Sequence, residues 1–403
     1  MKSIAISLLF LVTFAYAGTE KVIYTFQGGT DGFRPYSSLI FDQAGNLYGT
    51  TYYGGGDACS FGCGTVFELS PDGQGGWTES VLYRFTGGQD GEQPFAGLIL
   101  DPQGNLYVTT LGPGYGYGCP PSCGSVFELS PGSAGWTITV LHDFLGGADG
   151  DQPITQLAMD AAGNLYGTTG FGGANGSGVI YRLSKTKSST WNFAALPFTA
   201  GQPQGSPIVN KDGTIYGAAL GGPYNCGVLY SFSLNAQKKV VKKVLYAFKG
   251  GRDGGIPLGL AQAQDGSFYG VSPQNYQQPC VIPPGGSAFH LTQNQSGGWT
   301  NQIIYKFNTT PAIAPVSGVL IAPSGNLFGF TDDYAGGVYE LTPQSDGTFS
   351  ESTLYGFTGG SDGWDPWGVP VMDASGNLYG VTFQGGNNCA FDIQCGTVFE
   401  VTP

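Results

Sequence analysis

The chain is poor in charge and in histidine. Only 11% of its 403 residues are charged, and histidine occurs twice, at His142 and His290. These two residues are too far apart in sequence to form the H-E-x-x-H helix of a zinc protease. The net charge of −13 argues against nucleic-acid binding, which requires a basic surface. After residue 17, no apolar run approaches the roughly 18 residues of a transmembrane helix, so we expect no membrane span.

The N-terminal segment has the composition of an export signal. Lys2 precedes a short apolar run from Ile4 to Phe14, and Ala15-Tyr16-Ala17 then forms a small-x-small cleavage site. We therefore predict a signal peptide over residues 1–17, which is cleaved off. Residues 18–403 are predicted to form one domain of an exported protein, located in the periplasm or outside the cell.

Glycine and aromatic residues are abundant, and they recur in a fixed pattern. The chain has 70 Gly, 25 Pro and 14% aromatic residues, a composition typical of an all-β protein with many tight turns. The phrase GNLYGTT and its variants occur seven times, 50 to 59 residues apart, a spacing that indicates a repeat architecture. The copies begin at Gly45, Gly104, Gly163, Gly213, Gly266, Gly325 and Gly376.

Each repeat reads as four strands, and the phase of the repeats predicts a closed ring. A short apolar strand precedes the GNLYGTT strand, and phrases such as GTVFELS and VLYRF supply the third and fourth strands. The mature chain opens with a fourth-type strand at Val22 and ends with a third-type strand at Gly396. These two orphans can pair only if the chain closes on itself. We predict an all-β, seven-bladed β-propeller of four-stranded antiparallel blades, closed by the N-terminal strand, which folds as a monomer. A six-plus-one arrangement is the alternative.

The repeat also resembles a known family. The run Y-x-F-x-G-G-x-D-G-x-x-P, followed by D-x-x-G-N-L-Y-G-T-T and G-T-V-F-E-L, resembles the GloVer repeat, which is named for Gloeobacter and Verrucomicrobia. The resemblance covers essentially the whole mature chain. It implies a bacterial exported protein and brings no established biochemical activity with it.

Eight cysteines in an exported chain predict four disulfides. Three close pairs are expected, and the two remaining cysteines are paired by elimination. The predicted pairs are Cys59–Cys63, Cys119–Cys123, Cys389–Cys395 and Cys226–Cys280. The alternative is a zinc site built from the first two pairs, although structural zinc more often uses C-x-x-C spacing.

Five aspartates occupy equivalent positions in the GGxDG phrase, which joins the fourth strand of one blade to the first strand of the next. They are Asp31, Asp90, Asp149, Asp253 and Asp362. This loop and the variable second-to-third loops are expected on one face, around the mouth of the central channel. The aspartates could form a broken acidic ring that binds calcium or a cationic ligand, or they could be turn residues that bond nearby amides. We favour the turn interpretation and expect no other cofactor.

Two tryptophans depart from the repeat pattern. Trp77, Trp136, Trp191 and Trp299 share one repeat position and are predicted to pack between blades. Trp364 and Trp367 lie instead in the channel-face loop of the last copy. The first copy has Phe33 and Tyr36 there, and the second has Phe95. Exposed aromatic rings at that mouth would stack on sugars, whereas the alternative is that Trp367 begins a buried inner strand.

Three functions are compatible with these features. The first hypothesis is a secreted, non-enzymatic propeller that binds a glycan or another surface component through its loop-rich channel face. The alternative is an extracellular glycoside hydrolase or lyase that uses carboxylates or Tyr at the channel mouth. A third is a structural interaction module of the cell envelope. The sequence assigns no catalytic residue.

Overall fold

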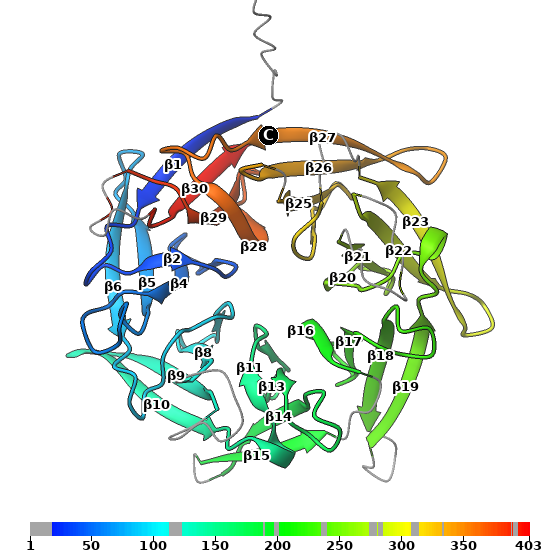
Figure 1. The fold of residues 1–403 in the computed structure, drawn as a ribbon, viewed down its shortest axis with the longest axis horizontal. Helices are drawn as coiled ribbons and strands as arrows, with labels where there is room; N and C mark the ends of the chain where they lie inside the picture. Colours follow the sequence, from blue (N-terminus) through cyan, green and yellow to red (C-terminus); the bar gives the residue numbers. More distant parts are fainter. Residues whose placement is uncertain are drawn as a thin grey trace, which may run out of the picture.

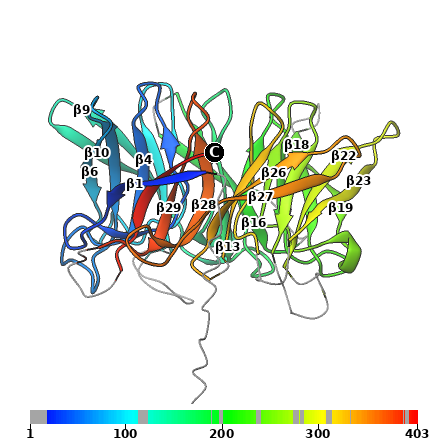
Figure 2. The same ribbon diagram turned by 90° about the horizontal axis from the view of Figure 1, so that it is seen from above.

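The protein is a ring of seven sheets around a central channel (Figure 1). The computed structural model describes residues 18–112, 123–187, 190–196, 201–234, 240–273, 280, 285–307, 314–332, 334–387, 389 and 394–403. Each sheet is an antiparallel blade with four strand positions, and the inner strand of two blades is broken into two pieces. Viewed from the side, the strands run between two loop-bearing faces (Figure 2). The prediction of an all-β, seven-bladed propeller is confirmed.

The strands take the same four positions in every blade. The inner strands are β2 (Phe33–Pro35) with β3 (Ile40–Phe41), β7 (Ile99–Leu100), β11 (Asp151–Pro153) with β12 (Ala158–Met159), β16 (Pro203–Val209), β20 (Gly259–Gln262), β24 (Leu320–Ile321) and β28 (Trp364–Met372). The second strands are β4 (Leu47–Tyr53), β8 (Leu106–Thr110), β13 (Leu165–Phe171), β17 (Ile215–Ala219), β21 (Phe268–Ser272), β25 (Leu327–Thr331) and β29 (Leu378–Gln384). The third strands are β5 (Thr65–Pro71), β9 (Ser125–Gly132), β14 (Ile180–Lys185), β18 (Val228–Leu234), β22 (Ser287–Gln293), β26 (Gly337–Pro343) and β30 (Thr397–Thr402). The outer strands are β6 (Trp77–Arg84), β10 (Gly135–Asp143), β15 (Trp191–Leu196), β19 (Val240–Ala247), β23 (Trp299–Lys306), β27 (Phe349–Gly356) and β1 (Thr19–Thr25).

The repeated GNLYGTT phrase builds the hairpin between the first two strands. Asp42 caps the turn, because its Oδ1 accepts hydrogen bonds from the backbone N–H groups of Ala44 and Asn46 at 2.8 and 2.9 Å. Burial raises the pKa of Asp42, but the hydrogen bonds from Asn46, Tyr48 and Ala44 together outweigh burial, and the pKa lies below its usual value. Gly49 is required by packing, since a Cβ there would lie 2.5 Å from the Phe67 ring of the third strand.

Adjacent blades pack through aromatic side chains at recurring positions. The predicted inter-blade tryptophans do this: the rings of Trp77 and Tyr379 lie 6.0 Å apart, and those of Trp191 and Tyr107 lie 6.2 Å apart. Each pair joins side chains of two neighbouring blades. The core is therefore a series of clusters between blades, as expected when each repeat contacts only its neighbours.

The N-terminal strand closes the ring. β1 pairs antiparallel with β30, and the register runs from Thr19 opposite Thr402 to Thr25 opposite Thr397. β1 therefore supplies the outer strand of the blade formed by β28, β29 and β30 (Figure 1). The first and last strands of the chain, which lack partners within their own repeats, pair with each other as predicted.

Three of the four predicted disulfides lie within the described residues, and all three form. They are Cys59–Cys63, Cys226–Cys280 and Cys389–Cys395. The pairing of Cys119 lies outside the described residues. In the described part of the chain, Cys59 and Cys63 are also the only cysteines grouped with a further potential metal ligand, Glu92. Their sulfurs are joined to each other, so they are not thiolate ligands for zinc.

Removing the Cys226–Cys280 bridge should cost more stability than removing a local one. The two cysteines are 54 residues apart, whereas Cys59 and Cys63 are 4 apart. Loop-closure entropy predicts a loss of about 4 kcal/mol for the double Cys→Ala variant of the long bridge and about 2 kcal/mol for the short one. Chemical denaturation of both variants measures the difference. Equal losses would contradict this account.

Candidate ligand site at the channel mouth

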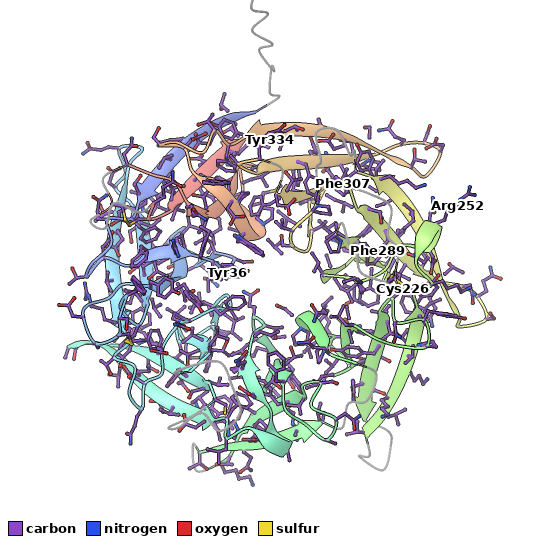
Figure 3. The ribbon with its side chains drawn as sticks, in the orientation of Figure 1. Tyr36, Cys226, Arg252, Phe289, Phe307 and Tyr334 are labelled. Carbon is purple, nitrogen blue, oxygen red and sulfur yellow. A yellow bond between two sulfur atoms is a disulfide. The ribbon has the colours of Figure 1, made fainter. Side chains whose placement is uncertain are left out.

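A cavity of about 450 Å³ lies at the centre of the ring, lined by all seven blades. Each blade contributes the residues that directly follow a proline recurring in the repeat. Figure 3 shows Tyr36, one of these residues, directed into the centre of the ring. The residues that follow the recurring proline are Tyr36, Phe95, Ile154, Gln204, Leu258, Val316 and Trp367.

Three aromatic residues from adjacent blades form one continuous wall of this cavity, which we call the aromatic wall: Trp367, Tyr36 and Phe95. The ring centroids of Tyr36 and Trp367 are 4.5 Å apart with an interplanar angle of 23°. Those of Tyr36 and Phe95 are 4.3 Å apart. Such pairs are each worth about 0.5–1.5 kcal/mol beyond their buried area. The three rings therefore stabilise one another in this arrangement.

The rest of the lining is small or uncharged. Gly97, Gly205 and Gly318 are among the lining residues and present no side chain to the cavity. Hydroxyl and amide side chains bridge neighbouring inner strands. The N–H of Val369 donates to Ser38 Oγ at 2.7 Å, and Gln156 Nε2 donates to the carbonyl of Leu98 at 2.6 Å. Among the described residues that line the cavity, none is Asp, Glu, Lys, Arg or His.

A recurring backbone kink precedes these lining residues. In five blades the residue before the proline has a positive φ, which is uncommon for a residue other than glycine. Its N–H bonds to a carbonyl in the second-to-third loop of the preceding blade, as when Arg34 donates to Cys395 and Gln93 donates to Cys63, both at 2.7 Å. The disulfide loops therefore anchor the start of the next inner strand. The five residues are Arg34, Gln93, Gln152, Ile256 and Asp365.

The GGxDG loops and the second-to-third loops share one face, as expected. The N–H of Gly55 donates to the carbonyl of Gly29 at 2.8 Å, and Gly386 donates to Gly360 at 3.0 Å. Each pair joins one loop of each kind within the same blade. Both loop families therefore surround the channel on the same side of the ring.

None of the five GGxDG aspartates is among the residues lining the cavity. Each turns back towards the residue seven positions earlier, on the outer strand. Asp362 accepts hydrogen bonds from the Tyr355 hydroxyl at 3.0 Å and from Thr358 N at 2.7 Å. Asp31 and Asp90 bond Tyr24 and Tyr83, Asp253 bonds Tyr246, and Asp149 lies 3.5 Å from His142. Among the described residues, no cluster of potential metal ligands includes them.

The three aromatic candidates take different positions. Trp367 belongs to the aromatic wall. Trp364 is 40% exposed, and its indole Nε1 donates to the carbonyl of Tyr334 at 2.9 Å. Phe33 is buried and stacks on Tyr53. Of the eight candidate ligand residues, Trp367 alone lines the cavity.

The sequence did contain a signal for the rest of the wall. Aligning the copies on the recurring proline shows that the next residue varies more than its neighbours, as in Pro35-Tyr36, Pro94-Phe95 and Pro366-Trp367. Across the seven repeats of this chain, the proline is invariant and the residue after it varies. Such a pattern is expected where a repeated scaffold carries a binding surface.

The fold and the site define a closed seven-bladed β-propeller with a ligand-sized channel, one side of which is aromatic. The chain belongs to the Gloeobacter/Verrucomicrobia repeat family, whose model matches residues 60–281. This confirms the resemblance found in the sequence. No curated protein matches the chain significantly.

Several solved structures share the fold. Virginiamycin B lyase from Staphylococcus aureus is 14% identical, with 96% of this chain and 100% of that chain covered and a TM-score of 0.55. The periplasmic gluconolactonase of Pseudomonas aeruginosa is 11% identical, with 86% and 97% covered and a TM-score of 0.54. A putative 6-phosphogluconolactonase from Bacteroides uniformis is 12% identical, with 90% and 89% covered and a TM-score of 0.52. At such low identity these likenesses concern the fold alone.

Proposed function

We propose that this is a non-enzymatic binding protein that takes a glycan at the channel mouth, with the aromatic wall contacting the sugar. The observation that carries the proposal is the placement of three aromatic side chains from adjacent blades on one side of a cavity of about 450 Å³. Ligand sites usually measure about 300–1,000 Å³ and combine apolar walls with a few polar groups. Gln204 and Ser206, on the opposite side of the ring, supply polar groups for sugar hydroxyls.

We also propose that the protein works outside the cytoplasm. Three disulfides form within the described residues, and such bonds persist mainly in oxidising compartments. In the described part of the chain, no helix is long and apolar enough to cross a bilayer. A soluble glycan-binding protein of the periplasm or cell exterior fits both findings.

The chemistry of the cavity favours binding over glycoside hydrolysis. Hydrolysis needs two carboxyl groups at the sugar, roughly 5 to 9.5 Å apart. The described residues that line the cavity include no carboxylate, and the GGxDG carboxylates are bonded to their own turns and outer strands. The Tyr36 hydroxyl is the titratable group that the described lining offers to a lyase.

Trp367→Ala should lower glycan affinity more than tenfold, because truncating an aromatic anchor of the wall removes most of its contact with the ligand. Trp364→Ala is the matched control: it changes the same residue type three positions away, outside the cavity. A glycan array identifies the ligand, and calorimetry on the wild type and both variants measures the affinity.

The same glycan panel should be assayed for product formation. Retention of a glycan by the wild type and by Trp364→Ala, without turnover, supports the proposal. If no glycan is retained, or if Trp367→Ala binds as well as wild type, the channel is not a glycan site. Formation of a hydrolysis or elimination product would replace the binding function with the enzymatic one.

A further inference from the structure

Arg34 lies beside the aromatic wall in an aromatic environment of its own. Its guanidinium carbon is 5.1 Å from the centroid of the Phe383 ring and 5.9 Å from that of Tyr53. Phe383 also makes an edge-to-face contact with Tyr36, at 5.6 Å between centroids. One ring therefore separates the guanidinium from the centre of the aromatic wall.

Among the described residues, no carboxylate forms an ion pair with Arg34. Its N–H backbone group is bonded to Cys395, but its side chain donates no hydrogen bond within the described part of the chain, and Nε is buried without a partner. The ion pairs among the described residues involve His142 and Lys185, not Arg34. Holding a guanidinium partly out of water without an anion is costly, and the two rings offset only part of that cost.

The geometry points to Arg34 as the receptor for the carboxylate of an acidic sugar, so that the ligand is a glycan containing hexuronic acid. This inference rests on the proposed function. A guanidinium presents a planar fork of N–H donors that matches a carboxylate in two parallel hydrogen bonds. In a hexuronic acid the carboxylate projects from the edge of the sugar ring. A ring held at the aromatic wall would therefore direct its carboxylate outward, towards a neighbouring donor such as Arg34.

The neighbouring blades indicate which substitution of Arg34 the backbone tolerates. The equivalent residues in the next two blades are Gln93 and Gln152, whose φ values of 57° and 56° match the 57° of Arg34. Glutamine is thus compatible with this backbone, and Arg34→Gln removes the charge without disturbing the kink. Arg252→Gln is the control for net charge, since Arg252 is exposed at the outer rim, far from Tyr36 (Figure 3).

The experiment compares oligomers of galacturonate, mannuronate and glucuronate with the same oligomers after reduction of their carboxyl groups. We expect wild type and Arg252→Gln to bind at least one uronate oligomer more tightly than its reduced form. Arg34→Gln should lose roughly 10- to 100-fold in affinity for that uronate, the cost of one charge-assisted hydrogen-bonded pair, and should bind the reduced form as wild type does. The thermal midpoint of Arg34→Gln should not fall below that of the wild type, because the substitution removes a buried donor without a partner.

The outcomes separate the two proposals. Suppose that the reduced oligomers bind at least as tightly as the uronates, and that Trp367→Ala weakens this binding. The role of Arg34 is then refuted, while glycan binding at the aromatic wall stands. If Arg34→Gln weakens uronate and reduced oligomer equally, Arg34 only supports the wall, and the inference is also overturned. If no oligomer of either kind binds, and the glycan array is equally empty, the proposed function itself fails.

Discussion

A chain that begins at Gly28 should fail to form a stable ring, whereas one that begins at Gly18 should fold normally. The shorter chain lacks β1, and with it Ile23 and Phe26, which are buried in the same core cluster as Phe67. The Phe26 ring lies 5.1 Å from the Phe67 ring. Burial of Phe26 alone is worth about 3–5 kcal/mol, out of a total stability of about 5–15 kcal/mol. The loss of β1 also exposes the hydrogen-bonding edge of β30.

Thermal unfolding and size-exclusion chromatography of the two chains measure this effect. A pair of point variants in the full-length ring controls for the change in length. Phe26→Ala should destabilise the ring by several kcal/mol, while Lys21→Ala, at an exposed position on the same strand, should have little effect. A chain starting at Gly28 that kept the melting temperature and monomeric size of the longer one would show that closure by β1 does not stabilise the ring.

The fold was predictable because the same sequence pattern occurs in every blade, and because the strand types at the two ends of the chain show where the repeat begins and ends. The Gly49 position recurs because the third strand presents an aromatic ring to it, and the Asp42 position recurs because the hairpin needs a capped turn. The orphan strands then determined the closure. What could not be foreseen was local: the inner strand is interrupted in two blades, between Pro35 and Ile40 and between Pro153 and Ala158.

The site was predictable only in part, because position along a loop does not give radial position in the ring. Asp31 and Tyr36 are five residues apart, yet the Asp31 carboxylate bonds Tyr24 on an outer strand while Tyr36 lines the channel. The spacing of seven residues between Tyr24 and Asp31 is present in the sequence. It indicates a hydrogen bond only once the structure shows that the loop folds back onto the outer strand. Trp367 was found because it departs from the repeat, whereas Arg34 resembles an ordinary loop residue until its surroundings are known.

Two glutamates at neighbouring blade boundaries should make the ring less stable at alkaline pH. Glu20 on β1 and Glu79 on β6 occupy equivalent positions, four residues before Tyr24 and Tyr83. Burial, and then repulsion by Asp362, raises the pKa of Glu20 to about 7. Burial, and then repulsion by Asp31, raises the pKa of Glu79 to about 7, although Arg84 opposes this. One oxygen of each carboxyl group is buried without a hydrogen-bond partner.

The direction of this pH dependence follows from the proton affinities of the carboxyl groups in the folded and unfolded states. A carboxyl group whose pKa is about 7 in the folded state and 4.5 in the unfolded chain binds its proton more tightly when folded. Its stabilising contribution is complete below pH 4.5 and is lost as the pH rises through 7. Both side chains are partly exposed, so solvent screening reduces the effect to about 1 kcal/mol for each group.

The double variant Glu20→Gln, Glu79→Gln isolates this contribution. Burial lowers the pKa of both His142 and His290, and their effect on stability has the opposite sign in the same pH range. The measured quantity is therefore the difference in unfolding free energy between variant and wild type, in which the histidine contribution cancels. The variant should gain about 2 kcal/mol at pH 8 and little at pH 5. Asp57→Asn, which removes one exposed negative charge, should shift the curve without changing its slope. Parallel curves for the double variant and the wild type would show that these boundary carboxyl groups do not couple the ring to pH.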